Sequence, residues 1–163
     1  MEFTDMIKQH MKKNIVYTTE DERLADVVFK MSNAEADIAI VKSKNDIVGV
    51  ITETDIYYAL VKEVLPESVK EEKKLRTFDD MKVIDFMQGP PVKKVMASCD
   101  PLGWHPCVDT FEDDTIENAI RIMQRSGLHH LLVLDKKNNL VGTLSSHEII
   151  NSISRRKTKP MKK

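Results

Sequence analysis

Apolar residues recur along the chain at a spacing typical of helices, and they do so twice. The two stripes consist of Leu24, Val27, Val28 and Met31 and of Ile116, Ala119, Ile120 and Met123. Positions i, i+3, i+4 and i+7 share one face of a helix, so both segments are predicted to be amphipathic helices. The stripes are 92 residues apart, and residues 16–21 match residues 108–113 at the same offset. The sequence therefore contains an internal repeat.

Each predicted helix is followed by two short apolar runs of strand length, separated by a polar turn. The runs are residues 38–41 and 48–51 in the first copy and residues 131–134 and 141–144 in the second. A final helix then begins near Asp55 in one copy and near Glu148 in the other. Each repeat is therefore predicted as strand, helix, strand, strand, helix, which gives a mixed α/β (α+β) fold.

A shorter segment also recurs before each repeat. Residues 7–11 resemble residues 92–96, but at an offset of only 85, which predicts an insertion within the second copy at residues 98–107. The expected organisation is a first repeat over 7–61, a charged linker over 62–91, a second repeat over 92–154 and a basic tail over 155–163.

Composition excludes several classes of function. The 163 residues are 41% hydrophobic and 31% charged with a formal net charge of −1, so no global attraction to nucleic acid or membrane is implied. The basic tail is expected to be a solvated arm. Apolar runs are too short to cross a bilayer, and no signal-peptide core is evident, so a cytoplasmic location is expected. Glycine-rich phosphate loops and familiar hydrolase motifs are missing from the sequence, so we expect no enzyme.

One polar pattern occurs at the same place in both repeats. Thr52 stands three residues before Asp55, and Ser145 stands three residues before Glu148. This is the pattern of a capping box, which the start of a helix would require in any case. A helix N-terminus can also hold a phosphate, and a nearby carboxylate can accept hydrogen bonds from the two hydroxyls of a ribose. The two interpretations are compatible, and either glycine before the motif, Gly49 or Gly142, would suit close approach or a bulge.

The order of elements resembles tandem CBS domains, also called a Bateman module. The resemblance rests on residues 49–56 and 142–149 and on residues 128–135, and it covers most of the chain. It implies two repeats packed about a pseudo-twofold axis, with AMP, ADP, ATP or S-adenosylmethionine in the clefts between them. Such modules regulate a partner enzyme, channel or transporter, which here would be a separate and unidentified protein. No resident cofactor is implied.

The resemblance also implies ligand contacts. The better site would use Thr52, Thr54 and Asp55, with the purine against backbone of Leu128, His129 and His130. The other site would use Ser145 and Glu148 against Ala36, Asp37 and Ile38. This second site is expected to be weaker, because His147 replaces a hydroxyl and glutamate is one methylene longer than the usual aspartate. Acidic residues over 20–22 and 112–114 favour AMP or S-adenosylmethionine over a triphosphate.

Two further features bear on partners. Cys99, His105 and Cys107 could bind a metal or form a redox disulfide, although their spacing is unlike recognised zinc sites and favours simple loop packing. The alternatives to a ligand-sensing module are a metal or redox sensor, a nucleic-acid-associated protein that uses the basic tail, and a protein-interaction scaffold without ligand. A homodimer is expected, because the final helices carry more apolar residues than one small sheet can cover. These residues are Ile56, Leu60, Ile149, Ile150 and Ile153.

Overall fold

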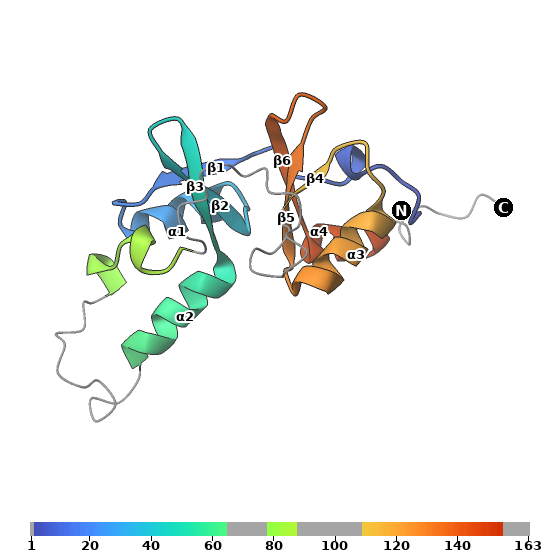
Figure 1. The fold of residues 1–163 in the computed structure, drawn as a ribbon. Helices are drawn as coiled ribbons and strands as arrows, with labels where there is room; N and C mark the ends of the chain where they lie inside the picture. Colours follow the sequence, from blue (N-terminus) through green and yellow to red (C-terminus); the bar gives the residue numbers. More distant parts are fainter. Residues whose placement is uncertain (1, 65–77, 88–108, 155–163) are drawn as a thin grey trace. The chain divides into compact units, whose positions relative to one another are not determined.

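The computed structural model describes residues 2–64, 78–87 and 109–154 (Figure 1). The chain divides into two compact units, one formed by residues 1–15 with 95–163 and the other by residues 16–94. The predicted counterpart of the first segment at 92–96, the insertion at 98–107 and the basic tail lie outside the described residues. Each unit contains one repeat.

The first repeat follows the predicted order. Its elements are β1 (Val16–Thr19), α1 (Leu24–Asn33), β2 (Ile38–Ser43), β3 (Asp46–Thr52) and α2 (Glu53–Val64). Strand β1 pairs with β2 in parallel, and β2 pairs with β3 antiparallel, so the sheet has the order β1-β2-β3. The parallel pair requires a crossover, which α1 supplies.

The second repeat has the same topology. Its elements are β4 (Asp109–Phe111), α3 (Ile116–Ser126), β5 (His130–Leu134), β6 (Leu140–Ser145) and α4 (Ser146–Ser154). The sheet order is β4-β5-β6, with a parallel pair followed by an antiparallel one. The mixed α/β fold predicted from the apolar pattern is confirmed.

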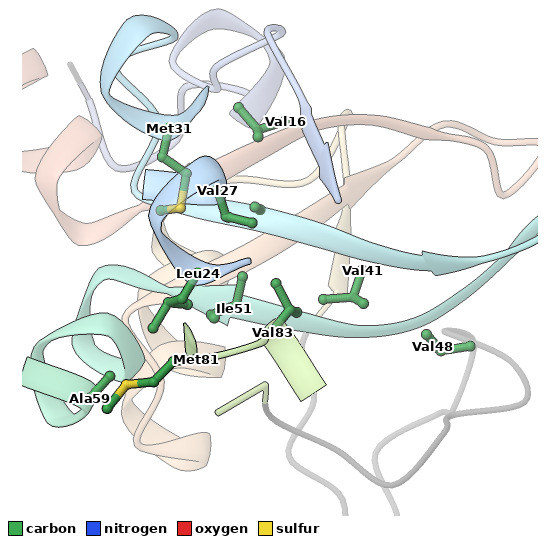
Figure 2. Packing of buried hydrophobic residues seen from close by; sticks show 11 residues of the cluster. Val16, Leu24, Val27, Met31, Val41, Val48, Ile51, Ala59, Met81 and Val83 are labelled. Carbon is green, nitrogen blue, oxygen red and sulfur yellow. The ribbon is translucent and has the colours of Figure 1, made fainter. Parts of the chain in front are cut away.

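The predicted apolar stripes pack against their own sheets. Leu24, Val27 and Met31 of α1 are buried in the core of the first repeat, where Figure 2 shows Leu24 close to Ile51 of β3. The equivalent residues of α3 are buried in a second core with strand residues such as Leu131 and Leu144. The fourth position of each stripe, Val28 or Ile120, is only half-buried, which fits its place at the edge of a helical face.

Each core is completed by a segment from outside its repeat. In the second repeat, η1 (Ile7–Gln9) inserts Ile7, which is fully buried. In the first repeat, η4 (Val83–Asp85) inserts Val83 in the same way, into the core that also contains Met81 (Figure 2).

The hydrogen bonds of these two segments correspond. The N–H of Ile7 donates to Asp114, and the N–H of Val83 donates to Glu22, at 2.9 and 3.0 Å. Residues 83–87 therefore occupy on the first repeat the place that residues 7–11 occupy on the second, at an offset of 76. Residues 83–87 lie within the stretch 62–91 that the sequence predicts to be a linker. The predicted counterpart of residues 7–11, at 92–96, lies outside the described residues.

Candidate functional site

The capping box of the first repeat is formed at the junction of β3 and α2. Asp55 Oδ2 accepts hydrogen bonds from the backbone N–H and from the Oγ1 hydroxyl of Thr52, at 2.8 and 2.7 Å. The backbone N–H of Asp55 lies 3.4 Å from Thr52 Oγ1. Both residues are buried, whereas Thr54 is exposed. A carboxylate is thus fixed in place at the start of a helix.

The second repeat carries the same arrangement with a longer acid. Glu148 Oε2 accepts from the backbone N–H of Ser145 at 2.7 Å and also from the Ser145 hydroxyl. Ser145 and Glu148 are both buried, and His147, at the position equivalent to Thr54, is exposed. Both capping boxes predicted from the sequence are therefore present.

Glu148 has a further partner that sequence reasoning missed. Lys12 Nζ lies 3.0 Å from Glu148 Oε1, and the Glu148 side chain is only 10% exposed. Lys12 is held there through its backbone, which exchanges hydrogen bonds of 2.8 and 2.9 Å with Thr143 of β6. In the sequence, the only feature that pointed to this region was the recurring segment over residues 7–11. It predicted that the segment belongs to a repeat, but it did not predict the contact between Lys12 and Glu148.

The residues predicted to contact a purine lie beside these motifs. The N–H of Glu53 donates to the carbonyl of Asp37 at 3.1 Å, and Ile38 pairs with Thr52 in the sheet. In the second repeat the N–H of Ser146 donates to the carbonyl of His129 at 2.9 Å. Residues 36–38 are therefore next to Thr52, and residues 128–130 are next to Ser145.

The two histidines differ in environment, as expected for neighbours entering a strand. His129 is exposed and His130, which pairs with Ser145 in the sheet, is half-buried. His129 and Leu128 also line a largely apolar surface cavity of about 460 Å³ between α3 and α4, together with Met123 and Ile150. The second repeat thus has a concave surface next to its motif.

The glycine before the second motif has a defined role. A Cβ at Gly142 would lie 2.6 Å from the carbonyl oxygen of Lys12, so the glycine permits the approach of neighbouring backbone. The β5–β6 register also shifts beside this position, between Val133 and Leu134, as does the β2–β3 register between Val41 and Lys42. Close approach and an irregularity in the strand pairing therefore both occur at Gly142.

The acidic residues after the first strand of each repeat are largely compensated. Asp113 accepts from Lys8 at 2.6 Å and lies 3.0 Å from Lys136, and these contacts, the Lys8 hydrogen bond first, lower the pKa of Asp113. Glu22 pairs with Lys30 at 2.6 Å. These ion pairs reduce the negative charge that the acids would present to a triphosphate. At Asp109, by contrast, burial raises the pKa of the carboxyl.

Within the described ranges, no helix is both long and apolar enough to span a membrane. Over the same residues, no group of three or more His, Cys, Asp or Glu side chains is placed to hold a metal ion. Cys99, His105 and Cys107 fall outside this part of the chain, so the metal and redox hypotheses for them stay predictions.

Solved structures of similar fold include proteins with bound adenosine compounds. A CBS domain protein from Pyrobaculum aerophilum complexed with AMP is 16% identical, with a TM-score of 0.61 over 93% of this chain and 99% of that one. A CBS domain pair in complex with 5′-methylthioadenosine and S-adenosyl-L-methionine is 14% identical, with a TM-score of 0.63 over 93% and 98%. A hexameric CBS-CP12 protein from bloom-forming cyanobacteria has a TM-score of 0.66 at 20% identity, over 98% and 77%.

Sequence comparison agrees with the structural likeness. A CBS domain-containing protein of Dictyostelium discoideum is 26% identical over 149 residues, which cover 90% of this chain and 89% of that protein. The family model of the CBS domain matches twice, at residues 7–62 and 103–155, and so spans more than half of the chain. The two matches coincide with the two repeats of the fold, and the chain belongs to the CBS domain family.

Proposed function

We propose that the chain is a regulatory module that binds an adenosine-containing ligand and thereby controls a partner protein. The candidate ligands are AMP, ADP, ATP and S-adenosylmethionine. The observation that carries the proposal is the buried Asp55 carboxylate, fixed by Thr52 at the first turn of α2. The adenosine compounds bound by two structural neighbours support the same ligand class.

The chemistry of this motif suits a ribose phosphate. A ribose offers two adjacent hydroxyls, and a carboxylate held in one orientation can accept hydrogen bonds from both. The backbone N–H groups at the start of α2 and the exposed hydroxyl of Thr54 are donors for a phosphate. The motif therefore combines a ribose acceptor with phosphate donors over one helical turn.

The proposed contacts are those implied by the family resemblance. They are Thr52, Thr54, Asp55, Leu128, His129 and His130 for the stronger site, and Ser145, Glu148, Ala36, Asp37 and Ile38 for the weaker one. Catalysis is no part of the proposal, because CBS domains are in general regulatory.

Titration calorimetry with AMP, ADP, ATP and S-adenosylmethionine tests the proposal. Replacing Asp55 with alanine should cost about 1 kcal/mol of stability through the lost cap. Losing two charge-assisted hydrogen bonds to ribose should lower affinity at least tenfold, because each contributes roughly 1.5–3 kcal/mol. Asp55→Asn is the matched control for stability, since an amide oxygen can still accept from Thr52 while the charge is lost.

The outcomes separate a helix cap from a ligand site. We expect both Asp55 variants to fold and to bind at least tenfold more weakly, and 2′-deoxyadenosine nucleotides to bind the wild type poorly. Equal affinity of wild type and Asp55→Ala would reduce the motif to a cap. No binding of any adenosine compound by the wild type would leave the fold as a protein-interaction scaffold.

We also propose that the chain forms a homodimer through its helices. Helix α4 exposes Ile150 and Ile153, which are 63% and 50% accessible, and α2 exposes Leu60 and two tyrosines, Tyr57 and Tyr58. Exposed apolar side chains on each of these helices favour association. Ile149 and Ile56 were also expected to be exposed, but Ile149 is buried in the second core and Ile56 is half-buried against the first.

A further inference from the structure

The ion pair of Lys12 with Glu148 is built into the fold. The backbone of Lys12 makes both hydrogen bonds of an antiparallel bridge with Thr143, and Gly142 leaves the space this bridge needs. Ile7, five residues earlier, is fully buried in the same core. The Lys12 side chain, 29% exposed, therefore starts from a fixed backbone position within reach of the acid.

Both oxygens of Glu148 are engaged within the chain. Oε2 accepts from the N–H and the hydroxyl of Ser145, and Oε1 lies 3.0 Å from the Lys12 ammonium. A ribose that used this acid would have to share or displace the ammonium, because the carboxylate side chain is only 10% exposed. Displacing a cation from a nearly buried carboxylate is costly, since the remaining charge loses its partner in a medium of low dielectric constant.

The first repeat differs at the equivalent position of the sequence. Residues 83–87 occupy the place of residues 7–11, so the residue that corresponds to Lys12 is Gln88, which itself lies outside the described residues. Glutamine carries no charge. The two motifs therefore differ in the sequence of their completing segments, which carry a lysine at position 12 and a glutamine at the matching position 88.

We propose that the Lys12 ammonium competes with ribose for the Glu148 carboxylate and prevents ribose from binding there. The chain then binds one adenosine ligand, although it carries two motifs that could each bind one. This inference rests on the proposed function, because it treats both acids as potential ribose acceptors. Lys12 is then a residue that sets the number of occupied sites.

Titration calorimetry with AMP on Lys12→Gln tests the proposal, since this variant copies the residue found at position 88. We expect the wild type to bind one AMP per chain, and the variant to gain a second site or to tighten it at least tenfold. The gain should vanish when Glu148→Ala is added. Lys8→Gln is the matched control, because Lys8 is another cation of the same segment but pairs with Asp113, and it should leave the stoichiometry unchanged.

A second variant protects the test against misfolding of the first. Glu148→Asp keeps the acid but withdraws it by one methylene from Lys12, and it too should gain AMP binding at the second motif. Melting curves without ligand establish that each variant is folded.

The outcomes distinguish the role of Lys12 from the proposed binding of an adenosine ligand at Asp55. One site in both wild type and Lys12→Gln overturns the role of Lys12 while the Asp55 site stands. A site that appears only in Lys12→Gln and depends on Glu148 supports the role of Lys12 even if the wild type binds nothing. The proposed role of Lys12 is overturned if the wild type binds two AMP molecules, one dependent on Asp55 and one on Glu148. It is also overturned if no variant binds AMP.

Discussion

Replacing Gly142 with alanine should detach the N-terminal segment from the second repeat. The added Cβ would lie 2.6 Å from the carbonyl oxygen of Lys12 and 2.9 Å from Met11 Sδ. Sulfur at the end of a flexible side chain can move, but the carbonyl belongs to the bridge with Thr143 and cannot move without breaking it. The substitution therefore acts on the backbone contact.

The expected cost follows from what the bridge holds. Two backbone hydrogen bonds join Lys12 to Thr143, and each contributes about 1 kcal/mol. Loosening them also weakens the packing of Ile7, so a total destabilisation of about 2–4 kcal/mol is expected, by comparison with core substitutions. Urea unfolding at neutral pH measures this, and hydrogen exchange at the amides of Lys12 and Thr143 reports the bridge directly.

Gly127→Ala is the matched control. Gly127 ends α3 with a φ of 69°, and no atom lies within 4 Å of a Cβ placed there. Only the left-handed backbone opposes the substitution, at a cost of about 1–2 kcal/mol. If Gly142→Ala were no more destabilising than Gly127→Ala and kept its Lys12 amide protected, the close approach would not constrain the fold.

Three other changes test separate contacts. Ile7→Ala should lower stability by about 3 kcal/mol through a cavity in the second core, measured by urea unfolding; a loss below about 1 kcal/mol would contradict its burial. Lys8→Met should reduce stability near neutral pH, because Lys8 lowers the pKa of Asp113. That stabilisation is present above the unfolded pKa of about 3.9 and is lost as pH falls through the lower folded value, so melting curves of wild type and variant should converge in acid. Ile150→Glu should convert a homodimer to monomer in light scattering, and a wild-type monomer would refute the proposed interface.

Local patterns predicted most of the fold. The stripes beginning at Leu24 and Ile116 gave the first helix of each repeat, because helical periodicity records which face is buried. The capping boxes of Asp55 and Glu148 were also predictable, since each involves residues three apart whose geometry is set by the start of a helix. Burial of Ile149 was not predicted. A nine-residue helix contains too few turns for the pattern alone to separate its core face from its exposed face.

The contacts that sequence could not predict are those of the segments that complete each core. Ile7 is far in sequence from the repeat whose core it enters, and nothing in a short apolar pattern states which sheet it will meet. The same is true of Val83, whose match to Ile7 became evident only from equivalent hydrogen bonds to Asp114 and Glu22.

Each repeat is completed by a segment from elsewhere in the chain, and this segment also affects the surroundings of the capping box. The second repeat receives its completing segment from residues 1–15, and that segment contains Lys12, whose ammonium lies 3.0 Å from Glu148 Oε1. The first repeat receives residues 78–87, and position 88, which follows, is neutral. If the proposed role of Lys12 is right, two nearly identical capping boxes differ in ligand binding because Lys12 reaches Glu148 from outside the second repeat. Changes in the completing segments should alter binding at one motif while leaving its capping box intact.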